Sequence, residues 1–395
     1  MTAGVLDGVR VLDFGRYVAG PYCATLLGYL GADVIRIERP GGGEDRAIAP
    51  VSTGGDGAVF LQTACNKRSL TLKPATPRGR EIVRRLVATA DVVVANLPDA
   101  TLRRLGLDYA SLSAIKPDIV LASQSAFGRT GPWAARGGFD GVGQAMSGAM
   151  FMTGTPGNPV KAAAPYVDYA TAVLSAFGVL AALMQRAQSG KGQEIEGTLL
   201  GTALAVFNAH LIEQGVLGLN RVGTGNRVQT SAPSDVFATR DGHVLVHVPS
   251  DHLFARWARL MGEAHWLADP RFATDALRGA HRDIICERMA AWCRVRTSED
   301  VLQHLSEAGI PAAPVLSLQQ ALEHPQTAAL DVLRRVDYPG LPQAAPIADL
   351  PLRMQAGAVG VRMPPPLPGQ HNRTILAELG YDEAEIEALR CEGII

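Results

Sequence analysis

The sequence has few cysteines and no excess of charge of either sign. Its 395 residues include five cysteines, an odd number without a C-x-x-C pair, which favours a reducing compartment over a disulfide framework. Lys and Arg number 37 and Asp and Glu number 38, so there is no basic field to attract nucleic acid or an anionic membrane surface. The composition therefore predicts a small-molecule partner.

Long apolar runs are missing as well. The first ten residues, MTAGVLDGVR, lack the apolar core of a secretion signal, and no run of eighteen uninterrupted apolar residues occurs. We therefore expect a soluble, cytoplasmic protein. At roughly 100 to 200 residues per domain, the length predicts two or three domains.

Several motifs of catalysis and cofactor binding are absent. The loop after the first predicted strand reads G-R-Y-V-A-G-P, which is neither the G-x-G-x-x-G of dinucleotide sites nor the G-x-x-x-x-G-K-[ST] of ATP sites. There is no G-x-S-x-G, and Ser147 is expected to be a small residue in a packed helix. His243 and His247 fall on a predicted strand rather than in H-E-x-x-H on a helix, so no metal site is predicted.

The sequence does contain a regular alternation of predicted strands and helices. Residues 9–14 and 33–38 are typical of strands, and they flank a helix that Pro21 opens and Gly31 closes. A short strand at 70–72, an amphipathic helix from Pro77 and strands at 91–95 and 118–123 follow. This order favours an α/β fold with a parallel, doubly wound sheet.

The middle of the chain is predicted to be helical and unusually apolar. The ranges 138–150, 167–188 and 194–214 are rich in Ala, Leu and Gly, so these helices need cover within the domain or from a second subunit. Residues near 225–325 are expected to form a smaller α+β domain that begins with a hairpin around Asp241-Gly242. A proline-rich, extended stretch at 338–369 and helices at 372–379 and 382–389 complete the chain.

Asp168 is the sharpest candidate for a reactive group. It stands in P-Y-V-D-Y-A, just before a long apolar helix. The alternative is a helix N-cap that accepts a backbone hydrogen bond, and the local pattern alone favours that role. The two roles are compatible, because a carboxylate at a helix N-terminus is expected to stay ionised at neutral pH.

A set of cations is the second candidate. Lys67 and Arg68 stand in N-K-R-S before a predicted strand, and together with Arg36, Arg39 and Arg104 they suit a multiply charged anion. Solvated surface charge is the alternative, and the pattern alone slightly favours it.

A series of short motifs runs through nearly the whole chain. In order they are V-L-D-F at 11–14, A-G-P at 19–21, L-G-A-D-V-I-R-I-E at 30–38, N-K-R-S at 66–69, N-L at 96–97, R-L-G at 104–106, G-F-D at 138–140, Q-A-M-S-G at 144–148 and G-K-G-Q at 190–193. In this order and spacing, and with the aspartate before a long helix, the chain resembles the class III CoA-transferase family, the CaiB/BaiF group.

The resemblance implies an architecture that pattern alone does not suggest. It predicts a Rossmann-like large domain whose parallel sheet is built from both termini, a smaller α+β domain, and an interlocked homodimer. Residues 1–220 would form the first part of the CoA-binding domain, 225–325 the small domain, and 326–395 a return segment that completes the large domain.

The resemblance also implies a reaction. The family's nucleophilic aspartate falls on Asp168, whose carboxylate would attack an acyl-CoA thioester to give an aspartyl anhydride and CoA thiolate. The thiolate would return to form an aspartyl-CoA thioester, and a free carboxylic acid would resolve it. Covalent catalysis of this kind needs water to be excluded, and it needs neither a metal nor a redox cofactor.

The expected CoA contacts follow from the same resemblance. The phosphates would lie near Arg39, Lys67, Arg68 and Arg104, and the pantetheine arm along Asn96 and Leu97. The turn formed by Tyr17, Val18 and Ala19 would face the thioester, where backbone donors stabilise oxyanion charge.

Three departures narrow the activity. Formyl-CoA:oxalate transferases have a glutamine where this chain has Val18, and the glycine run that gates some members is absent near 248–252. The α-methylacyl-CoA racemase branch has a histidine at the position of Phe139. Racemisation at one carbon needs two bases, and Phe139 is not one. The alternatives to a CoA-transferase are a racemase or isomerase, which Phe139 disfavours, and a non-catalytic acyl-CoA-binding protein.

Overall fold

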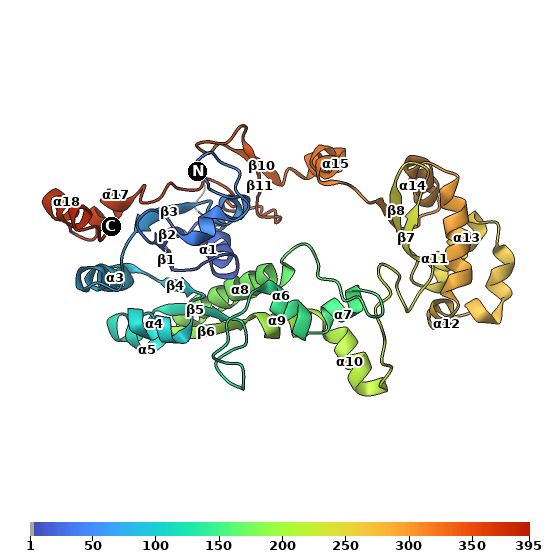
Figure 1. Ribbon diagram of the computed structural model, residues 1–395, viewed down its shortest axis with the longest axis horizontal. Coiled ribbons are helices and arrows are strands. Elements are labelled where there is room, and N and C mark those ends of the chain that lie inside the picture. The colour runs from blue at the N-terminus through green and yellow to red at the C-terminus, as the bar shows by residue number, and fades with distance from the viewer. Residues whose placement is uncertain (1–3) are drawn as a thin grey trace. The chain divides into compact units, whose positions relative to one another are not determined.

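The chain divides into two compact units. The computed structural model describes residues 4–395. Unit 1 comprises the chain up to Ser147 together with Ala162–Gly215 and Ala328–Ile395, and unit 2 comprises Gly148–Lys161 and Val216–Thr327. The two ends of the described chain therefore belong to the same unit, which Figure 1 shows in blue and red.

A six-stranded parallel sheet forms the centre of unit 1, which confirms the predicted α/β class. Its order is β3-β2-β1-β4-β5-β6. In doubly wound folds with this order, ligands bind beside the carboxyl ends of the strands where the order reverses, here between β1 and β4. The strands are β1 (Arg10–Asp13), β2 (Asp33–Glu38), β3 (Lys67–Thr71), β4 (Val92–Ala95), β5 (Val120–Ser125) and β6 (Gln193–Thr198).

Alternate residues of the strands build two separate cores, because successive side chains point to opposite faces of a sheet. Val11 and Val92 contribute to a core on one face together with residues of α1 and α8, whereas Leu12 and Val93 contribute to a core on the other face with residues of α3, α17 and α18. The helices of unit 1 are α1 (Ala19–Tyr29), α2 (Ala58–Thr63), α3 (Pro77–Thr89), α4 (Asp99–Leu105), α5 (Tyr109–Ile115), α6 (Asp140–Met146), α8 (Tyr166–Ser189), α9 (Leu199–Val206), α17 (Asn372–Glu378) and α18 (Glu383–Cys391).

The C-terminal segment contributes helices to the large unit but no strand to its parallel sheet. All six strands come from residues 10–198, so the expectation of a sheet built from both termini is wrong. The segment docks beside β3, where Asn372 Oδ1 accepts from the Thr71 N–H at 2.9 Å and His371 Nδ1 accepts from the Ser69 N–H at 3.1 Å. Figure 1 shows α17 close to this edge of the sheet.

Three local predictions need correction. The range 194–214 begins not as a helix but as strand β6, whose Glu-Ile-Glu alternation fits the exposed edge of a sheet. The proline-rich stretch overlaps an antiparallel hairpin of β10 (Leu333–Val336) and β11 (Ala345–Ala348). Helix α1 begins at Ala19, two residues before Pro21, and not at Pro21 itself. A proline fits at this position because N–H groups in the first turn have no partner in the helix.

Unit 2 has a small three-stranded antiparallel sheet of β7 (Ser234–Ala238), β8 (His243–His247) and β9 (Ala312–Pro314). Ala238 pairs with His243 across the turn, which confirms the hairpin around Asp241-Gly242. The fully buried Trp257 belongs to its core. The helices of unit 2 are α7 (Ala149–Thr153), α11 (Asp251–Leu260), α12 (Asp275–Ala280), α13 (Arg282–Arg294), α14 (Ser298–Glu307) and α15 (Leu318–Glu323), with the short 3₁₀ helices η2 (Ala264–Ala268) and η3 (Pro270–Phe272). Two further helices, α10 (Asn208–Leu217) and α16 (Pro325–Leu330), have residues in both units, and the 3₁₀ helix η1 (Glu44–Ala47) belongs to unit 1.

Helix α8 is 24 residues long. Among residues 4–395 it is the one helix long and apolar enough to cross a membrane by length and composition. It packs against α1, β5 and β6, and eight of its side chains are buried there. One side of this helix therefore contributes to the core of unit 1.

Candidate active site

The loop between β1 and α1 is fixed by side chains from three different places in unit 1. Its three consecutive N–H groups each donate to a separate side chain: Gly15 to Asp13 Oδ1 at 2.8 Å, Arg16 to Asn96 Oδ1 at 2.7 Å and Tyr17 to Asp45 Oδ2 at 3.3 Å. The Asn96 amide also donates to the Arg16 carbonyl at 2.7 Å. Asn96 directly follows β4, so it ties the β1 loop down at the point where the strand order reverses.

Two glycines allow the loop to turn so closely. A Cβ at Gly15 would lie 2.7 Å from the Pro21 ring, and a Cβ at Gly20 would lie 3.0 Å from Asn96 Oδ1. The distance at Gly15 is too short for a side chain, and the distance at Gly20 would require Asn96 to shift. The two glycines of the G-x-x-x-x-G-P sequence therefore serve the close packing of this loop.

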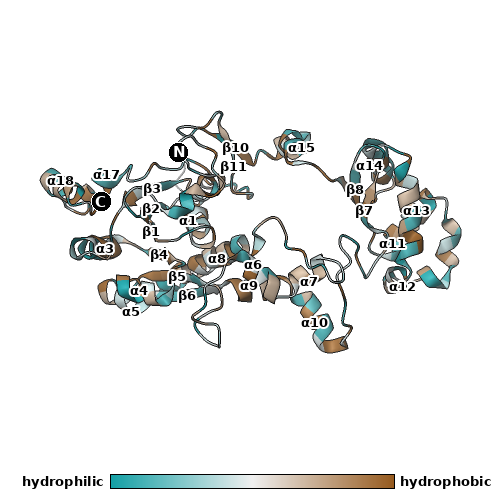
Figure 2. Ribbon diagram, in the orientation of Figure 1, coloured by the Kyte–Doolittle hydropathy of each residue, from teal (hydrophilic) through white to brown (hydrophobic). Residues whose placement is uncertain are grey.

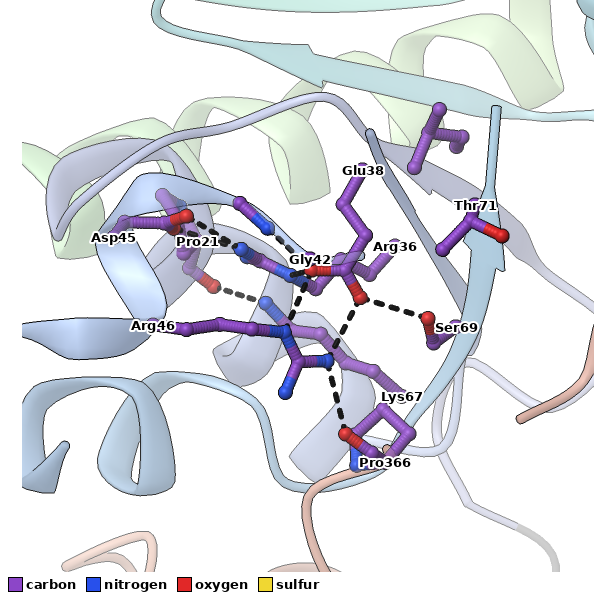
Figure 3. Close-up of polar contacts among 12 residues, drawn as sticks. Pro21, Arg36, Glu38, Gly42, Asp45, Arg46, Lys67, Ser69, Thr71 and Pro366 are labelled. Atoms are coloured by element: carbon purple, nitrogen blue, oxygen red, sulfur yellow. Dashed lines mark hydrogen bonds and ion pairs between the residues drawn. The ribbon is translucent and has the colours of Figure 1, made fainter. Parts of the chain in front are cut away.

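A network of paired charges lies beside this loop, at the ends of β2 and β3 (Figure 3). Glu38 Oε1 accepts from Arg46 Nη2 at 2.8 Å and from the Ser69 hydroxyl at 2.7 Å, and Arg36 Nη2 donates to both oxygens of Asp45 at 2.9 and 2.7 Å. Burial opposes ionisation of Glu38, but the bonds from Arg46 and the charge of Arg36 outweigh it and lower its pKa to about 2.

Asp168 lies in the first turn of α8, next to the beginning of α1. Val167 shares an apolar cluster with Ala19, the first residue of α1, and the Tyr169 ring packs edge-to-face on Tyr22 with centroids 4.8 Å apart. The residues on both sides of Asp168 therefore hold it beside the β1–α1 loop. Its side chain is 8% exposed, and its oxygens accept no hydrogen bond from any residue in the range 4–395.

The capping role predicted for Asp168 belongs to Asp140. Asp140 Oδ1 accepts from the N–H groups of Val167 at 2.7 Å and Asp168 at 3.2 Å, whereas the cap position itself is Pro165. Gln144 Nε2 in turn donates to Asp140 Oδ2 at 2.5 Å. Because Asp140 satisfies the start of the helix, the carboxylate of Asp168 is left available for other chemistry.

The ionisation of Asp168 differs from what the sequence predicts. Burial, and then the nearby charge of Asp140, raise the pKa of Asp168 to about 7. The helix N-terminus favours the charged form, but desolvation is the larger effect here. Near neutral pH the carboxylate is therefore divided between its acid and its base form, rather than fully ionised.

An aromatic pair stands between the loop and the Asp140 corner. Tyr17 has φ +63°, in the left-handed region, and its ring packs edge-to-face on Phe139 with centroids 5.2 Å apart. Phe139 is 63% exposed and precedes Asp140 directly. The two aromatic rings therefore connect the β1 loop to the residue that caps α8.

Two of the cations predicted to meet CoA are engaged elsewhere. Lys67 is 1% exposed, and its ammonium lies 2.7 Å from both Asp13 Oδ2 and the Pro21 carbonyl. Arg68 binds Asp33 and Glu378 with distances down to 2.6 Å, at the amino ends of the strands. Both residues therefore help to hold unit 1 together, and their contacts with CoA phosphates stay a prediction.

The other residues predicted to contact CoA are two exposed arginines, a half-buried leucine and the residues of the β1–α1 loop. Arg104 on α4 is exposed and has no ion pair within residues 4–395, and Arg39 is exposed with its Nε on the Gly42 carbonyl at 2.8 Å. Leu97 is half-buried beside the core. In the loop, the Tyr17 N–H is already bonded to Asp45, whereas the N–H groups of Val18 and Ala19 have no acceptor among the described residues.

Sequence reasoning missed Asp45 and Asp140, the two carboxylates that organise the site. Their partners are distant in sequence, since Asp45 reaches Tyr17 and Asp140 reaches Asp168. The one available signal was the G-F-D motif, which ends on Asp140. Over residues 4–395 no three His, Cys, Asp or Glu side chains gather as a metal site would require.

The comparisons with known proteins identify the family of the chain. The family model for CoA-transferase family III matches residues 6–372. A succinyl-CoA–D-citramalate CoA-transferase from Chloroflexus aurantiacus is 34% identical, over 99% of this chain and 98% of its own length. A succinyl-CoA:glutarate CoA-transferase from Mus musculus is 33% identical, over 99% of this chain and 90% of its own.

A solved structure gives the same result. The crystal structure of a CaiB/BaiF family protein from Brucella suis matches with a TM-score of 0.84 and 32% identity, over 96% of this chain and 100% of that chain. The match extends along nearly the whole chain, as the family model does, and confirms the resemblance that the motifs carry. The chain belongs to CoA-transferase family III and is an acyl-CoA:carboxylate CoA-transferase.

Proposed function

We propose that the protein moves CoA from an acyl-CoA to a free carboxylic acid through covalent intermediates on Asp168. The observation that carries this proposal is the state of the Asp168 carboxylate: it is buried, accepts no hydrogen bond from the described residues and lies in the first turn of a helix that another carboxylate already caps. A partly desolvated carboxylate is a better nucleophile than a fully hydrated one, and the reaction requires that water be kept from the anhydride while it exists.

The reaction balances without any other reactant. The Asp168 carboxylate attacks the acyl carbonyl, the carbon–sulfur bond breaks, and CoA leaves as a thiolate from an aspartyl anhydride. The thiolate attacks the aspartyl carbonyl and releases the donor acid, which leaves an aspartyl-CoA thioester. The acceptor carboxylate then attacks this thioester to form a second anhydride, and the CoA thiolate takes the new acyl group and regenerates Asp168.

The oxyanions in these steps need hydrogen-bond donors. The N–H groups of Val18 and Ala19 are suited to this role, because they open α1, have no acceptor in residues 4–395 and lie at the positive end of a helix dipole. Tyr17 contributes through its position in the loop, since its own N–H is bonded to Asp45.

The CoA molecule would extend from this loop along the carboxyl ends of the strands. We assign its phosphates to Arg39 and Arg104, which are exposed and not paired with carboxylates in the described chain. The pantetheine arm would pass Leu97 and Asn96 at the end of β4. This path follows the ligand crevice expected where the order of the strands reverses.

We infer that the substrates are dicarboxylic. The two relatives described above are named for succinyl-CoA together with D-citramalate or glutarate. In all three of these acids, a second carboxylate remains after one has formed the thioester. Succinyl-CoA and glutarate are therefore suitable first probes for this chain.

We also propose that the protein works as an interlocked homodimer. Unit 1 exposes large apolar side chains on α8, α9 and its part of α10. One of them is Phe177 on α8, which is 70% exposed. Figure 2 shows brown, apolar stretches on α9 and α10. Surfaces of this kind mark protein interfaces, and a second copy would cover Val173, Leu174, Phe177, Met184, Val206 and Ile212.

An exchange assay tests the proposed function. The full-length protein is incubated with succinyl-CoA and carbon-13-labelled glutarate, and the appearance of labelled glutaryl-CoA is measured by mass spectrometry for the wild type and for Asp168→Ala. We expect transfer by the wild type and a loss of at least about 10⁴-fold in Asp168→Ala, as for removal of other covalent nucleophiles. Full activity of the variant would contradict the proposal. Exchange of the substrate α-hydrogen in deuterated water, without any acceptor acid, would instead support a racemase, and binding of CoA without transfer to any acid in a panel would support a binding protein.

A further inference from the structure

We propose that Asp45 is a positioning residue for CoA transfer: held by Arg36, it fixes the left-handed backbone of Tyr17 and thereby aims the N–H groups of Val18 and Ala19 at the reacting carbonyl. The inference rests on the proposed function, because it assumes that the β1–α1 loop faces the thioester at Asp168.

The backbone of Tyr17 is held in an uncommon conformation. Residues other than glycine seldom adopt a positive φ, and they persist there when their surroundings hold them. Tyr17 has φ +63°, and its N–H donates to Asp45 Oδ2 at 3.3 Å. The preceding residue, Arg16, is held at both its N–H and its carbonyl by Asn96. The strained residue is therefore fixed by one side chain and its predecessor by another.

Asp45 is itself held in place by Arg36. Both of its oxygens accept from Arg36 Nη2, at 2.9 and 2.7 Å, and the side chain is 3% exposed. Arg36 is completely buried, lies 3.5 Å from Glu38 and packs over the Phe60 ring at 5.5 Å. The buried guanidinium is bonded to both carboxylate oxygens, so it orients the carboxylate that accepts from Tyr17. Figure 3 shows this arrangement of Asp45, Arg36 and Glu38.

Tyr17 links Asp45 to the residues near Asp168. Val18 and Ala19 come directly after it, so a rotation of the Tyr17 backbone would change the direction of their N–H groups near Asp168. On its other side, the Tyr17 ring packs on Phe139, next to the Asp140 that caps the helix of Asp168. A misplacement of about 1 Å in such a group costs about 100-fold in rate.

A matched set of variants in the full-length protein tests the inference. Asp45→Ala removes the acceptor of the Tyr17 N–H. Arg36→Met with Asp45→Ala removes both charges, so that no unpaired charge stays buried and the protein still folds. Asp56→Ala is the control: Asp56 belongs to the same network, bonded to Arg46 at 3.3 Å and to the Tyr338 hydroxyl at 2.5 Å, but does not contact the loop.

Two measurements separate positioning from stability. With succinyl-CoA and glutarate we expect kcat to fall about 100-fold in both Asp45 variants, with the KM for succinyl-CoA within about twofold of the wild type. Hydrogen exchange of the peptide covering residues 14–22 should quicken in these variants and not in Asp56→Ala. A kcat equal to that of Asp56→Ala, or unchanged exchange in the loop, would overturn the inference. The exchange result does not depend on the nucleophile, so activity retained in Asp168→Ala would contradict the proposed function alone.

Discussion

Two groups of buried carboxylates in unit 1 have opposite electrostatic environments. At the ends of β1 and β2, Asp13, Glu38 and Asp45 are each paired with a buried cation, Lys67, Arg46 or Arg36. At the start of α8, Asp168 has no cation and stands near another carboxylate, Asp140. The pKa of Glu38 is lowered to about 2, and that of Asp168 is raised to about 7.

This difference distinguishes carboxylates that hold the fold from the one that suits a reaction. A paired carboxylate has its lone pairs occupied and its charge compensated, so it positions neighbours and does not react. An unpaired, desolvated carboxylate costs stability, and such groups cluster at functional sites. The rule also applies to the cations, because Lys67 and Arg68 are paired whereas Arg104 is not.

The largest effect is expected where a paired charge loses its partner. Lys67→Met leaves Asp13 buried without its ammonium, and we expect the free energy of unfolding to fall by about 3 to 5 kcal/mol. Arg68→Met is the control, since its partners Asp33 and Glu378 are partly exposed, and it should cost at most about 1 kcal/mol. Denaturant unfolding followed by circular dichroism measures both. Equal losses in the two variants would remove the distinction between the buried and the exposed pair.

Removing the unpaired carboxylate of Asp168 is expected to raise the free energy of unfolding instead of lowering it. The pKa of Asp168 is about 7 in the folded protein and near its ordinary value of 3.8 in the unfolded chain, so ionisation weakens the fold as pH rises between these values. Asp168→Asn removes this penalty, and its advantage in stability should grow from pH 4 to pH 7 and level off at about 4 kcal/mol. Unfolding of both proteins at pH 5 and pH 8.5 checks this. A variant that is no more stable than the wild type at pH 8.5 would show that the carboxylate has a partner.

A smaller effect is expected at the cations of α4. Arg104→Ala should raise the KM for succinyl-CoA about 10-fold, the usual scale of one charge-assisted hydrogen bond to a phosphate. Its neighbour Arg103 pairs with Asp99 at 3.5 Å, so Arg103→Ala should change KM by less than about twofold. Steady-state kinetics at fixed ionic strength decides between them. A larger effect at Arg103 would place the phosphates on another face of α4.

Much of the fold could be predicted from local patterns. The strand predicted at 33–38 and the helix predicted from Pro77 begin at the same residues in the structure. Their signals, apolar periodicity and a proline in the first turn, depend only on residues a few positions apart. Strand β6 was missed because Glu194 and Glu196 make it polar, and its pairing with β5 lies some seventy residues away in sequence. Local patterns do not contain that partner.

The site was predicted only in part, for the same reason. The position of Asp168 near the start of a long helix is a local feature of the sequence, and the order of the motifs made it the candidate nucleophile. The burial of Lys67 depends on Asp13, which is 54 residues away, and the amino-end position of Arg68 depends on the register of β2 and β3. The raised pKa of Asp168 depends first on burial and then on the charge of Asp140, and both arise only when the helices α6 and α8 are brought together.

The most direct test of the central claim is to capture the bond on Asp168. The protein is mixed with succinyl-CoA at pH 8, quenched within one turnover in hydroxylamine, digested and examined by mass spectrometry. The account predicts a hydroxamate on Asp168, formed from the anhydride or the aspartyl-CoA thioester, and its loss as the pH falls through about 7, where the carboxylate becomes protonated. An adduct on a different residue, or turnover without any adduct, would contradict it.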